Sequence, residues 1–331
     1  MTAAPAPSGV PVTILSGFLG AGKTTLLNHI LSNQQGVKTA VLVNEFGEIG
    51  IDNDLIVATE DDTVELSNGC ICCSINDELL SAVERILDRP SPMDYIVVET
   101  TGLADPLPVA MTFLGSELRD STRLDSIITL IDAENFDDNV LDTQVGRAQV
   151  VYGDILLLNK CDLVPEQRLK DLEQTLRAVK NDARILYSVK GDVPLPLLLS
   201  VGLFETDKVV APNHDHGHSH DHGVNADHLA VDGFTSLSFQ SEGPFSLRKF
   251  QNFLDNQLPQ EVFRSKGILW FQESERRHVF HLAGKRFSID DTDWTGVRKN
   301  QLVLIGRDLD HDLLRQQLQA CVASETSNGP A

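Results

Sequence analysis

The stretch GFLGAGKT at residues 17–24 decides the fold class of this 331-residue chain. It matches the pattern G-x-x-x-x-G-K-[ST] at every position, between an apolar β-rich run (12–16) and a helical run (23–31). Glycines allow the backbone amides of such a loop to turn inward around phosphate groups, at the N-terminus of the helix that follows. The stretch therefore predicts a P-loop nucleotide-binding domain.

This loop supplies the first candidate site residues. We expect Lys23 to reach the β- and γ-phosphates and Thr24 to ligate Mg²⁺, so both are also candidate catalytic residues. We expect Thr25 to continue the helix and to touch the α-phosphate. The predicted phosphate-binding residues are Gly17, Gly20, Ala21, Gly22, Lys23, Thr24 and Thr25.

Short apolar runs alternate with helical patterns as far as residue 201. The apolar runs lie at 12–16, 39–44, 95–99, 127–131, 155–158 and 185–188, and the helical patterns at 23–31, 77–87 and 166–179. Nearly continuous apolar strands are typical of a parallel sheet that is covered on both faces. The alternation predicts an α/β domain with a mostly parallel, doubly wound sheet.

The composition changes after this domain. A low-complexity His/Asp/Gly run within 206–230 cannot form a core, so this segment is predicted to be a linker. Beyond it, the patterns predict strands at 234–239, 267–271, 279–282, 286–289 and 302–305, and helices at 246–258 and 309–322. The predicted layout is a disordered lead-in at 1–9, a P-loop domain at 10–205, the linker, a small α+β domain at 231–323 and a tail at 324–331.

Residues 159–162 read N-K-C-D and follow the apolar run 155–158. In a P-loop domain, the carboxylate of N-K-x-D can accept from N1–H and the exocyclic amine of guanine, a donor pair that adenine lacks. Asn159, Lys160 and Asp162 are therefore predicted to select GTP and GDP. Ser188, after the next strand, is predicted to lie in a loop that supports guanine O6, and an ordinary loop is an equal alternative.

A third motif, E-T-T-G at 99–102, comes at the end of the run 95–99. A carboxylate at a strand end, followed by a glycine, fits the Mg²⁺- and γ-phosphate-sensing segment of P-loop enzymes. Glu99 is predicted to hold a Mg²⁺-bound water or to orient the attacking one, and the sequence leaves both roles open. The amide of Gly102 is predicted to contact the γ-phosphate.

Three cysteines, Cys70, Cys72 and Cys73, fall within four residues. Thiolates so close together favour a soft or borderline cation such as Zn²⁺. No second C-x-x-C pair follows, which argues against a closed four-cysteine structural site. We expect an open site of two or three thiolates and a further ligand, while small residues buried at a turn or a redox pair remain alternatives.

Two other segments could contribute to metal binding. Glu45 and Glu48 follow the second predicted strand, which brings them to the edge of the sheet that carries the phosphate loop. A solvated acidic turn is the alternative there. Five alternating histidines give a loose binding site for divalent cations, against the alternative of a solvated loop. They are His214, His216, His218, His220 and His222.

Composition excludes several classes of function. The net charge is −21 and there is no basic stripe, which argues against a nucleic-acid partner. No apolar run is long enough to span a bilayer, and residues 1–9 lack the pattern of a secretory signal. We therefore expect no membrane association and a cytoplasmic protein.

Taken together, these motifs resemble those of the CobW-like GTPases, metallochaperones related to the nickel-inserting GTPases. The motifs are GFLGAGKTTLL (17–27), NEFGE (44–48), GCICCS (69–74), ETTGLADP (99–106) and NKCD (159–162). The runs KGILWF (266–271) and LVLIGRDLD (302–310) resemble that family's second domain, so the resemblance covers essentially the whole chain.

The resemblance implies a slow intrinsic GTPase that binds Zn²⁺, Co²⁺ or Ni²⁺ and delivers the metal to a client metalloprotein under nucleotide control. It implies that Glu45, Cys72 and Cys73 are the metal ligands, with Cys70 adjacent. A nucleotide- or metal-dependent homo-oligomer is a further expectation. Two alternatives remain: a cobalt-handling GTPase of cobalamin synthesis, and a metal-storage protein without a productive GTPase cycle.

Overall fold

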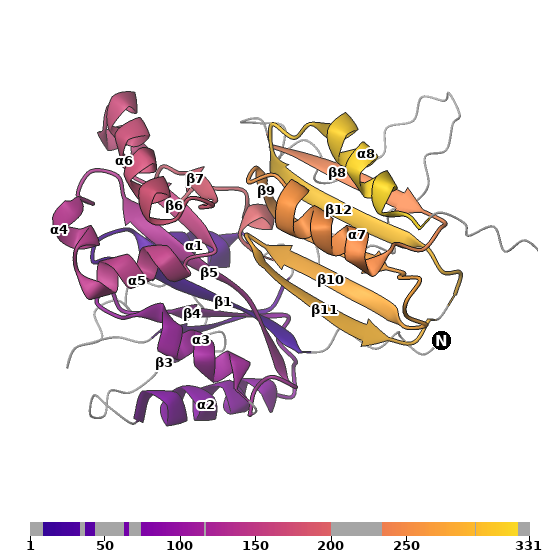
Figure 1. The fold of residues 1–331 in the computed structure, drawn as a ribbon. Coiled ribbons are helices and arrows are strands. Elements are labelled where there is room, and N and C mark those ends of the chain that lie inside the picture. The colour runs from indigo at the N-terminus through magenta and orange to yellow at the C-terminus, as the bar shows by residue number, and fades with distance from the viewer. Residues whose placement is uncertain are drawn as a thin grey trace, which may run out of the picture. The chain divides into compact units, whose positions relative to one another are not determined.

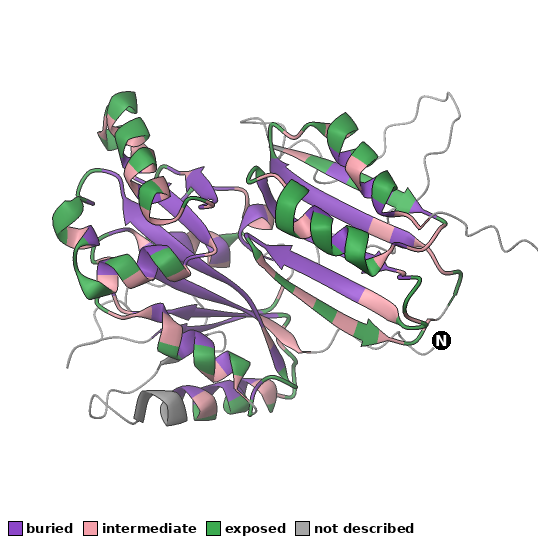
Figure 2. Cartoon of the chain, in the orientation of Figure 1, coloured by how far each residue is buried: buried purple, intermediate pink, exposed green. Residues whose placement is uncertain are grey.

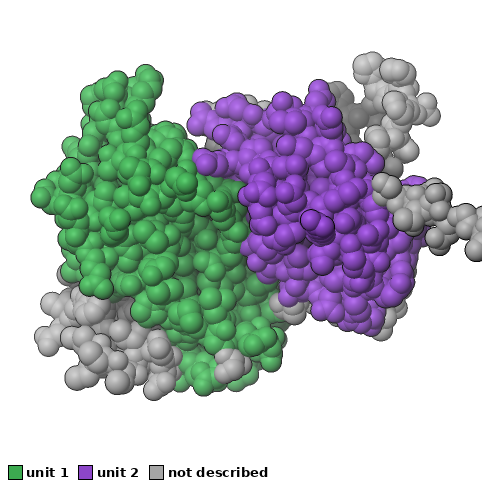
Figure 3. Space-filling model, viewed as in Figure 1, with its two compact units in different colours: residues 1–202, 283–286 green, residues 203–282, 287–331 purple. Residues whose placement is uncertain are grey.

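The computed structural model describes residues 9–33, 37–43, 63–65, 74–115, 117–199, 234–294 and 296–323. The chain divides into two compact units (Figure 3). Unit 1 comprises Met1–Gly202 and Ala283–Arg286, and unit 2 comprises Leu203–Leu282 and Phe287–Ala331.

Unit 1 contains a seven-stranded sheet in the order β3-β2-β4-β1-β5-β6-β7 (Figure 1). All of its strand pairs are parallel. The strands are β1 (Val10–Gly17), β2 (Thr39–Val43), β3 (Thr63–Glu65), β4 (Tyr95–Glu99), β5 (Thr122–Asp132), β6 (Ile155–Asn159) and β7 (Ile185–Tyr187). The predicted α/β class with a parallel sheet is confirmed.

Helices flank this sheet and cover its apolar strands. They are α1 (Lys23–Ser32), α2 (Ser74–Leu87), α3 (Pro106–Leu114), α4 (Asp138–Leu141), α5 (Gln144–Tyr152) and α6 (Glu166–Val179). One core cluster joins β1, β2 and β4 to α2 and α3, and another joins β5 and β6 to α4, α5 and α6. Figure 2 shows the result, with buried strands and helices that are exposed on one side.

Three of these helices, α3, α4 and α5, were not predicted. The first turn of α3 contains two prolines, which are not typical of a helix interior, so the sequence did not indicate a helix there. The side chain of Asp105 caps this helix, because it accepts from the Leu107 amide at 2.9 Å. Short helices such as α4 carry too few residues for a periodic apolar pattern. The side chain of Asp137 caps the N-terminus of α4, and that of Thr143 caps the N-terminus of α5.

Strand β5 begins five residues earlier than the predicted run 127–131. Polar residues interrupt the apolar pattern in this added part, and in the structure they form hydrogen bonds. Asp125, which is buried, accepts from Tyr95 Oη at 2.5 Å and from Arg123 at 3.3 Å. Burial of a charged side chain in a strand is tolerated when it is paired in this way.

Unit 2 contains a five-stranded sheet in the order β11-β10-β9-β12-β8. Its elements are β8 (Phe234–Ser241), α7 (Leu247–Asn252) with a π-helical turn (Phe253–Gln257), β9 (Val262–Leu269), β10 (Arg277–Ala283), β11 (Arg286–Thr292), β12 (Asn300–Arg307) and α8 (His311–Cys321). β12 is antiparallel to both β8 and β9. Its core is rich in phenylalanine, with Phe250 packed against Phe245, Phe271 and Phe280. The predicted α+β class of this part is confirmed.

Parallel pairing brings the ends of the strands of unit 1 together. Leu15 is in register with Glu99, and Asp132 with Asn159. The predicted motifs therefore meet along the carboxyl edge of one sheet, which is where open α/β sheets bind ligands. No helix among the described residues has the length and apolar character that a membrane span requires.

Candidate nucleotide and metal site

The phosphate loop connects β1 to α1, and two of its glycines are required by its geometry. Gly17 has φ 134°, and a Cβ there would lie 2.3 Å from the Leu130 carbonyl oxygen. Gly22 has φ 102°, and its Cβ would lie 2.4 Å from Asn159 Nδ2. Any other residue would be strained at both positions. The loop leads into the N-terminus of α1, which is an anion-binding arrangement.

Lys23, the first residue of α1, is buried. Its Nζ donates to the carbonyl oxygen of Gly17 at 3.0 Å and to that of Phe18 at 3.4 Å. The ammonium group is therefore held against the loop whose amides would surround a phosphate. This is the position in which a lysine can act on the phosphates.

Thr24 and Glu99 come together across the β1–β4 pair. Thr24 Oγ1 donates to Glu99 Oε1 at 3.4 Å, and Glu99 is only 6% exposed. The three predicted catalytic residues thus come from the first turn of α1 and the end of β4. Of the other predicted loop residues, Ala21 is buried, whereas Gly20 and Thr25 are exposed.

The segment after Glu99 is packed against the phosphate loop. A Cβ on Gly102 would lie 2.6 Å from Leu19 Cδ2 and 2.7 Å from Leu19 N. On the other side, Gln149 Nε2 donates to the carbonyl oxygens of Gly102 at 3.3 Å and Ala104 at 3.1 Å. Gln149 was not predicted, because a single glutamine inside a helix carries no local signal of this role.

Asn159 links the segment predicted to bind the base with the loop predicted to bind the phosphates. Its Nδ2 donates to the Ala21 carbonyl oxygen at 2.9 Å. Its Oδ1 accepts from Ser188 Oγ at 3.1 Å and from the Gly191 amide at 3.0 Å. Asn159 is 2% exposed, so these bonds form inside the protein. One amide side chain therefore joins the loops that follow β1, β6 and β7.

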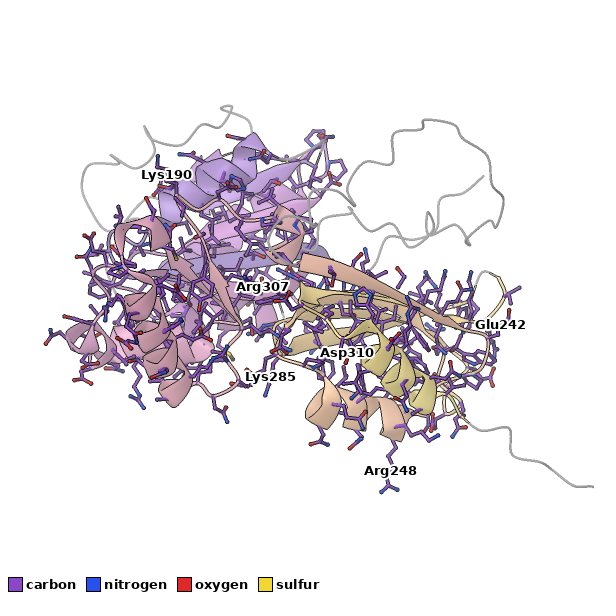
Figure 4. All side chains as sticks on the ribbon, turned by 90° about the horizontal axis from the view of Figure 1, so that it is seen from above. Lys190, Glu242, Arg248, Lys285, Arg307 and Asp310 are labelled. Atoms are coloured by element: carbon purple, nitrogen blue, oxygen red, sulfur yellow. The ribbon has the colours of Figure 1, made fainter. Side chains whose placement is uncertain are left out.

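Lys160 and Asp162 follow Asn159 at the start of a short turn. Lys160 has a left-handed backbone, φ 62°, and its Nζ lies 2.7 Å from Asp132 Oδ2. Asp162 lies in the 3₁₀ turn Cys161–Leu163 with an exposed side chain. Lys190, in the loop after β7, is also exposed, and Figure 4 labels it at the outside of unit 1. Asp132 was not predicted, although a carboxylate at the end of an apolar run is a signal that could have revealed it.

The predicted ligands of Zn²⁺ or a similar cation lie outside the described residues, unlike Thr24, the predicted ligand of Mg²⁺. This holds for Glu45, for Cys70, Cys72 and Cys73, and for His214, His216, His218, His220 and His222. These assignments therefore stay predictions. In the part of the chain that the structure describes, no three His, Cys, Asp or Glu side chains are grouped as a metal site would require.

Comparison with known proteins identifies the family of both parts of the chain. The model of the family "CobW/HypB/UreG, nucleotide-binding domain" matches residues 11–187, and that of the "Cobalamin synthesis protein cobW C-terminal domain" matches residues 234–322. The first match lies within unit 1, and most of the second lies within unit 2.

Individual relatives match over nearly the whole chain. "Zinc-regulated GTPase metalloprotein activator 1" of Dictyostelium discoideum is 31% identical, covering 96% of this chain and 80% of its own. "Zinc chaperone YjiA" of Escherichia coli strain K12 is 33% identical, covering 92% and 96% respectively. The solved structure of Zn(II)-bound YjiA GTPase from E. coli is 27% identical, covers 95% of this chain and 99% of its own, and gives a TM-score of 0.46.

Proposed function

This chain belongs to the CobW/HypB/UreG family of nucleotide-binding proteins, and we propose that it is a GTP-hydrolysing metallochaperone. It binds GTP and GDP with Mg²⁺ at the carboxyl edge of the sheet of unit 1. It holds Zn²⁺, or a similar divalent cation such as Co²⁺ or Ni²⁺, at the Cys-x-Cys-Cys segment. It delivers that metal to a client metalloprotein whose identity is unknown.

The bridge made by Asn159 carries the nucleotide part of this proposal. The Asn159 side chain forms hydrogen bonds with Ala21 in the phosphate loop and with Ser188 in the loop after β7, so it fixes both loops close together. A nucleotide, with phosphates at one end and a base at the other, can engage both loops at once. The exposed carboxylate of Asp162 then favours guanine, since it can accept from N1–H and the exocyclic amine.

The phosphate end supports hydrolysis. Thr24 and Glu99 bring together a hydroxyl and a buried carboxylate 3.4 Å apart, which are hard oxygen ligands that fit Mg²⁺. When bound, Mg²⁺ neutralises charge on the phosphates. Lys23 supplies a fixed positive charge to the phosphates, and Glu99 orients water for attack. The Gly102 amide contacts the γ-phosphate that hydrolysis removes.

The metal part of the proposal rests on sequence and on the relatives. Cys70, Cys72 and Cys73 offer soft thiolates in one short segment, and Glu45 offers a further ligand. Relatives that match most of this chain carry the names zinc chaperone and zinc-regulated GTPase. The five histidines of 214–222 form a second, weaker store of metal on the same chain.

Control of metal binding by the nucleotide requires that the two affinities be linked. If GTP changes the affinity for Zn²⁺ by some factor, Zn²⁺ must change the affinity for GTP by the same factor. The test is a Zn²⁺ titration of the full chain with a non-hydrolysable GTP analogue and with GDP. We expect two different dissociation constants; equal values would overturn control of metal binding by the nucleotide.

Two variants separate the two predicted metal sites. Replacing Cys72 and Cys73 together by Ser should abolish tight Zn²⁺ binding and leave the weak binding. Replacing His214, His216, His218, His220 and His222 by Asn should do the reverse, so it is the matched control. Tight binding that survives the double serine variant would show that the metal site lies elsewhere.

Cobalt is the second candidate cargo, favoured by the match of unit 2 to a domain described from cobalamin synthesis. Thiolates and imidazoles accept Zn²⁺ and Co²⁺ alike, so residue types do not choose between them. A pull-down from metal-starved cells, followed by metal analysis of the complex, decides the cargo and captures the client. A pure storage protein would bind metal without any GTP turnover, even with the client present.

A further inference from the structure

Asp132 is a buried carboxylate at the candidate site that the proposed roles do not use. It is the last residue of β5, in register with Asn159 at the end of β6, and only 7% of it is exposed. Its Oδ2 accepts from Lys160 Nζ at 2.7 Å and from Asn135 Nδ2 at 2.9 Å. A buried charge is costly unless it is paired in this manner.

The turn after β5 fixes the other oxygen of this carboxylate. Oδ1 accepts from the amides of Glu134 at 3.0 Å and Asn135 at 3.3 Å. Burial raises the pKa of Asp132, but the hydrogen bonds from Asn135 and Lys160 outweigh it and hold the pKa below its ordinary value. The carboxylate is therefore ionised at neutral pH and cannot rotate away from Lys160 without losing bonds to its own turn.

Lys160 is the residue on which this anchor acts. Its side chain is 30% exposed and would sample many rotamers without a partner. The ion pair with Asp132 therefore immobilises this long side chain. Its backbone is left-handed, and its carbonyl oxygen accepts from the Leu163 amide at 3.0 Å. The same residue thus starts the turn that carries Asp162.

We propose that Asp132 is a positioning residue for guanine nucleotides, which acts by fixing Lys160 at the start of the turn that carries the base-binding carboxylate of Asp162. The alkyl stem of Lys160 then forms a preorganised apolar side for the base and ribose, and the turn presents Asp162 at a constant place. Preorganisation lowers the entropy lost on binding. This inference rests on the proposed function, because it concerns the same nucleotide.

The variant that removes the ion pair and keeps the backbone bonds of the turn is Asp132→Asn. An asparagine Oδ1 can still accept from the amides of Glu134 and Asn135, so the turn is kept. Its Nδ2 is a donor and faces the ammonium group of Lys160 and the side-chain amide of Asn135, so the ion pair and the hydrogen bond from Asn135 are both lost. We expect fluorescently labelled GDP and GTP to dissociate about tenfold faster in stopped-flow measurements, as the loss of one charge-assisted hydrogen bond implies.

A double-mutant cycle with Lys160→Met distinguishes positioning from a general structural role. Lys160→Met alone should reproduce the faster release. It removes the same ion pair from the other side, and the bonds of Asp132 to Asn135 and to the Glu134 amide stay in place. Because Asp132 acts through Lys160, the double variant should be no faster than either single one. Additive effects of the two substitutions would overturn the inference.

The matched control is Asp138→Asn, which removes the same charge from an exposed position shortly after the same strand. It should release nucleotide at the wild-type rate. Wild-type release rates in Asp132→Asn and Lys160→Met would overturn the role of Asp132 alone. A wild-type chain that binds no guanine nucleotide would instead overturn the proposed function, and this inference with it.

Discussion

The two ends of the candidate nucleotide site lie on one sheet edge but are held by different means. At the base end, side chains bind one another: Asn159 joins three loops, and Lys160 pairs with the buried Asp132 at 2.7 Å. At the phosphate end, the backbone dominates. Lys23 donates to carbonyl groups of its own loop, and Glu99 meets Thr24 at the long distance of 3.4 Å.

This difference agrees with what each end is predicted to recognise. Phosphate oxygens are bound by backbone amides, which any loop with the right glycines can present. A base is distinguished by the pattern of its donors and acceptors, which requires side chains held at fixed places. Substitutions at the phosphate end should therefore lower the rate of GTP hydrolysis, while those at the base end should change which nucleotide binds.

The largest effect should come from Lys23→Met at the phosphate end. Loss of a preorganised positive charge should lower the rate of GTP hydrolysis by about 10²–10³-fold. The ratio of the GTP and ATP affinities should stay close to that of the wild type, because the base end is untouched. Single-turnover hydrolysis and competition binding measure both quantities, with the exposed Lys170→Met as the control. A variant that hydrolyses GTP at the wild-type rate would remove Lys23 from the mechanism.

Asp162→Asn should produce the next largest effect, at the base end. Loss of the acceptor for two guanine donors should weaken GTP binding by roughly 100-fold. The amide can donate to the C2 carbonyl of xanthine, so binding of xanthosine triphosphate should improve. Isothermal titration with both nucleotides tests this, and Asp171→Asn on the exposed side of α6 is the control. Unchanged discrimination between the two bases would contradict the guanine assignment.

The sequence predicted what depends on local backbone chemistry. The glycines at 17 and 22 are read directly from the loop pattern, because the positive φ that they adopt is a local property. The parallel sheet also followed from local signals, as continuous apolar runs alternated with helical ones. The segment with Cys72 and Cys73 was equally visible in the sequence, but it lies outside the described residues and stays a prediction.

The sequence did not predict what depends on contacts between distant segments. Gln149 meets Gly102, 47 positions earlier, and Asp132 meets Lys160, 28 positions later. The sequence pattern around a glutamine in a helix does not depend on whether the side chain contacts a solvated turn or a functional loop. Only the parallel register shows that Asp132 and Asn159 end neighbouring strands.

Gly102→Ala should cause a smaller change that is confined to the phosphate end. The new methyl group would meet backbone atoms of Leu19 at 2.7–2.8 Å, so one of the two loops must move. We expect the free energy of unfolding to fall by about 1–3 kcal/mol, as overpacking usually costs. Urea unfolding measures this, and Gly296→Ala is a control with open space around its Cβ. An unchanged stability would mean that the loops are not packed together as described.

The smallest effect should come from Gln149→Met, which keeps the size of the side chain and removes its two hydrogen bonds to the loop after Glu99. The carbonyl oxygens of Gly102 and Ala104 lose a buried donor, which should lower the free energy of unfolding by about 1 kcal/mol. Gln144→Met, at the exposed start of the same helix, should have no such effect. Binding of the guanine base should be unaffected, because none of the contacts described for Gln149 reaches Asn159, Lys160 or Asp162. A loss of GTP-over-ATP selectivity in Gln149→Met would therefore show that the two ends are coupled, and would break the distinction drawn between them.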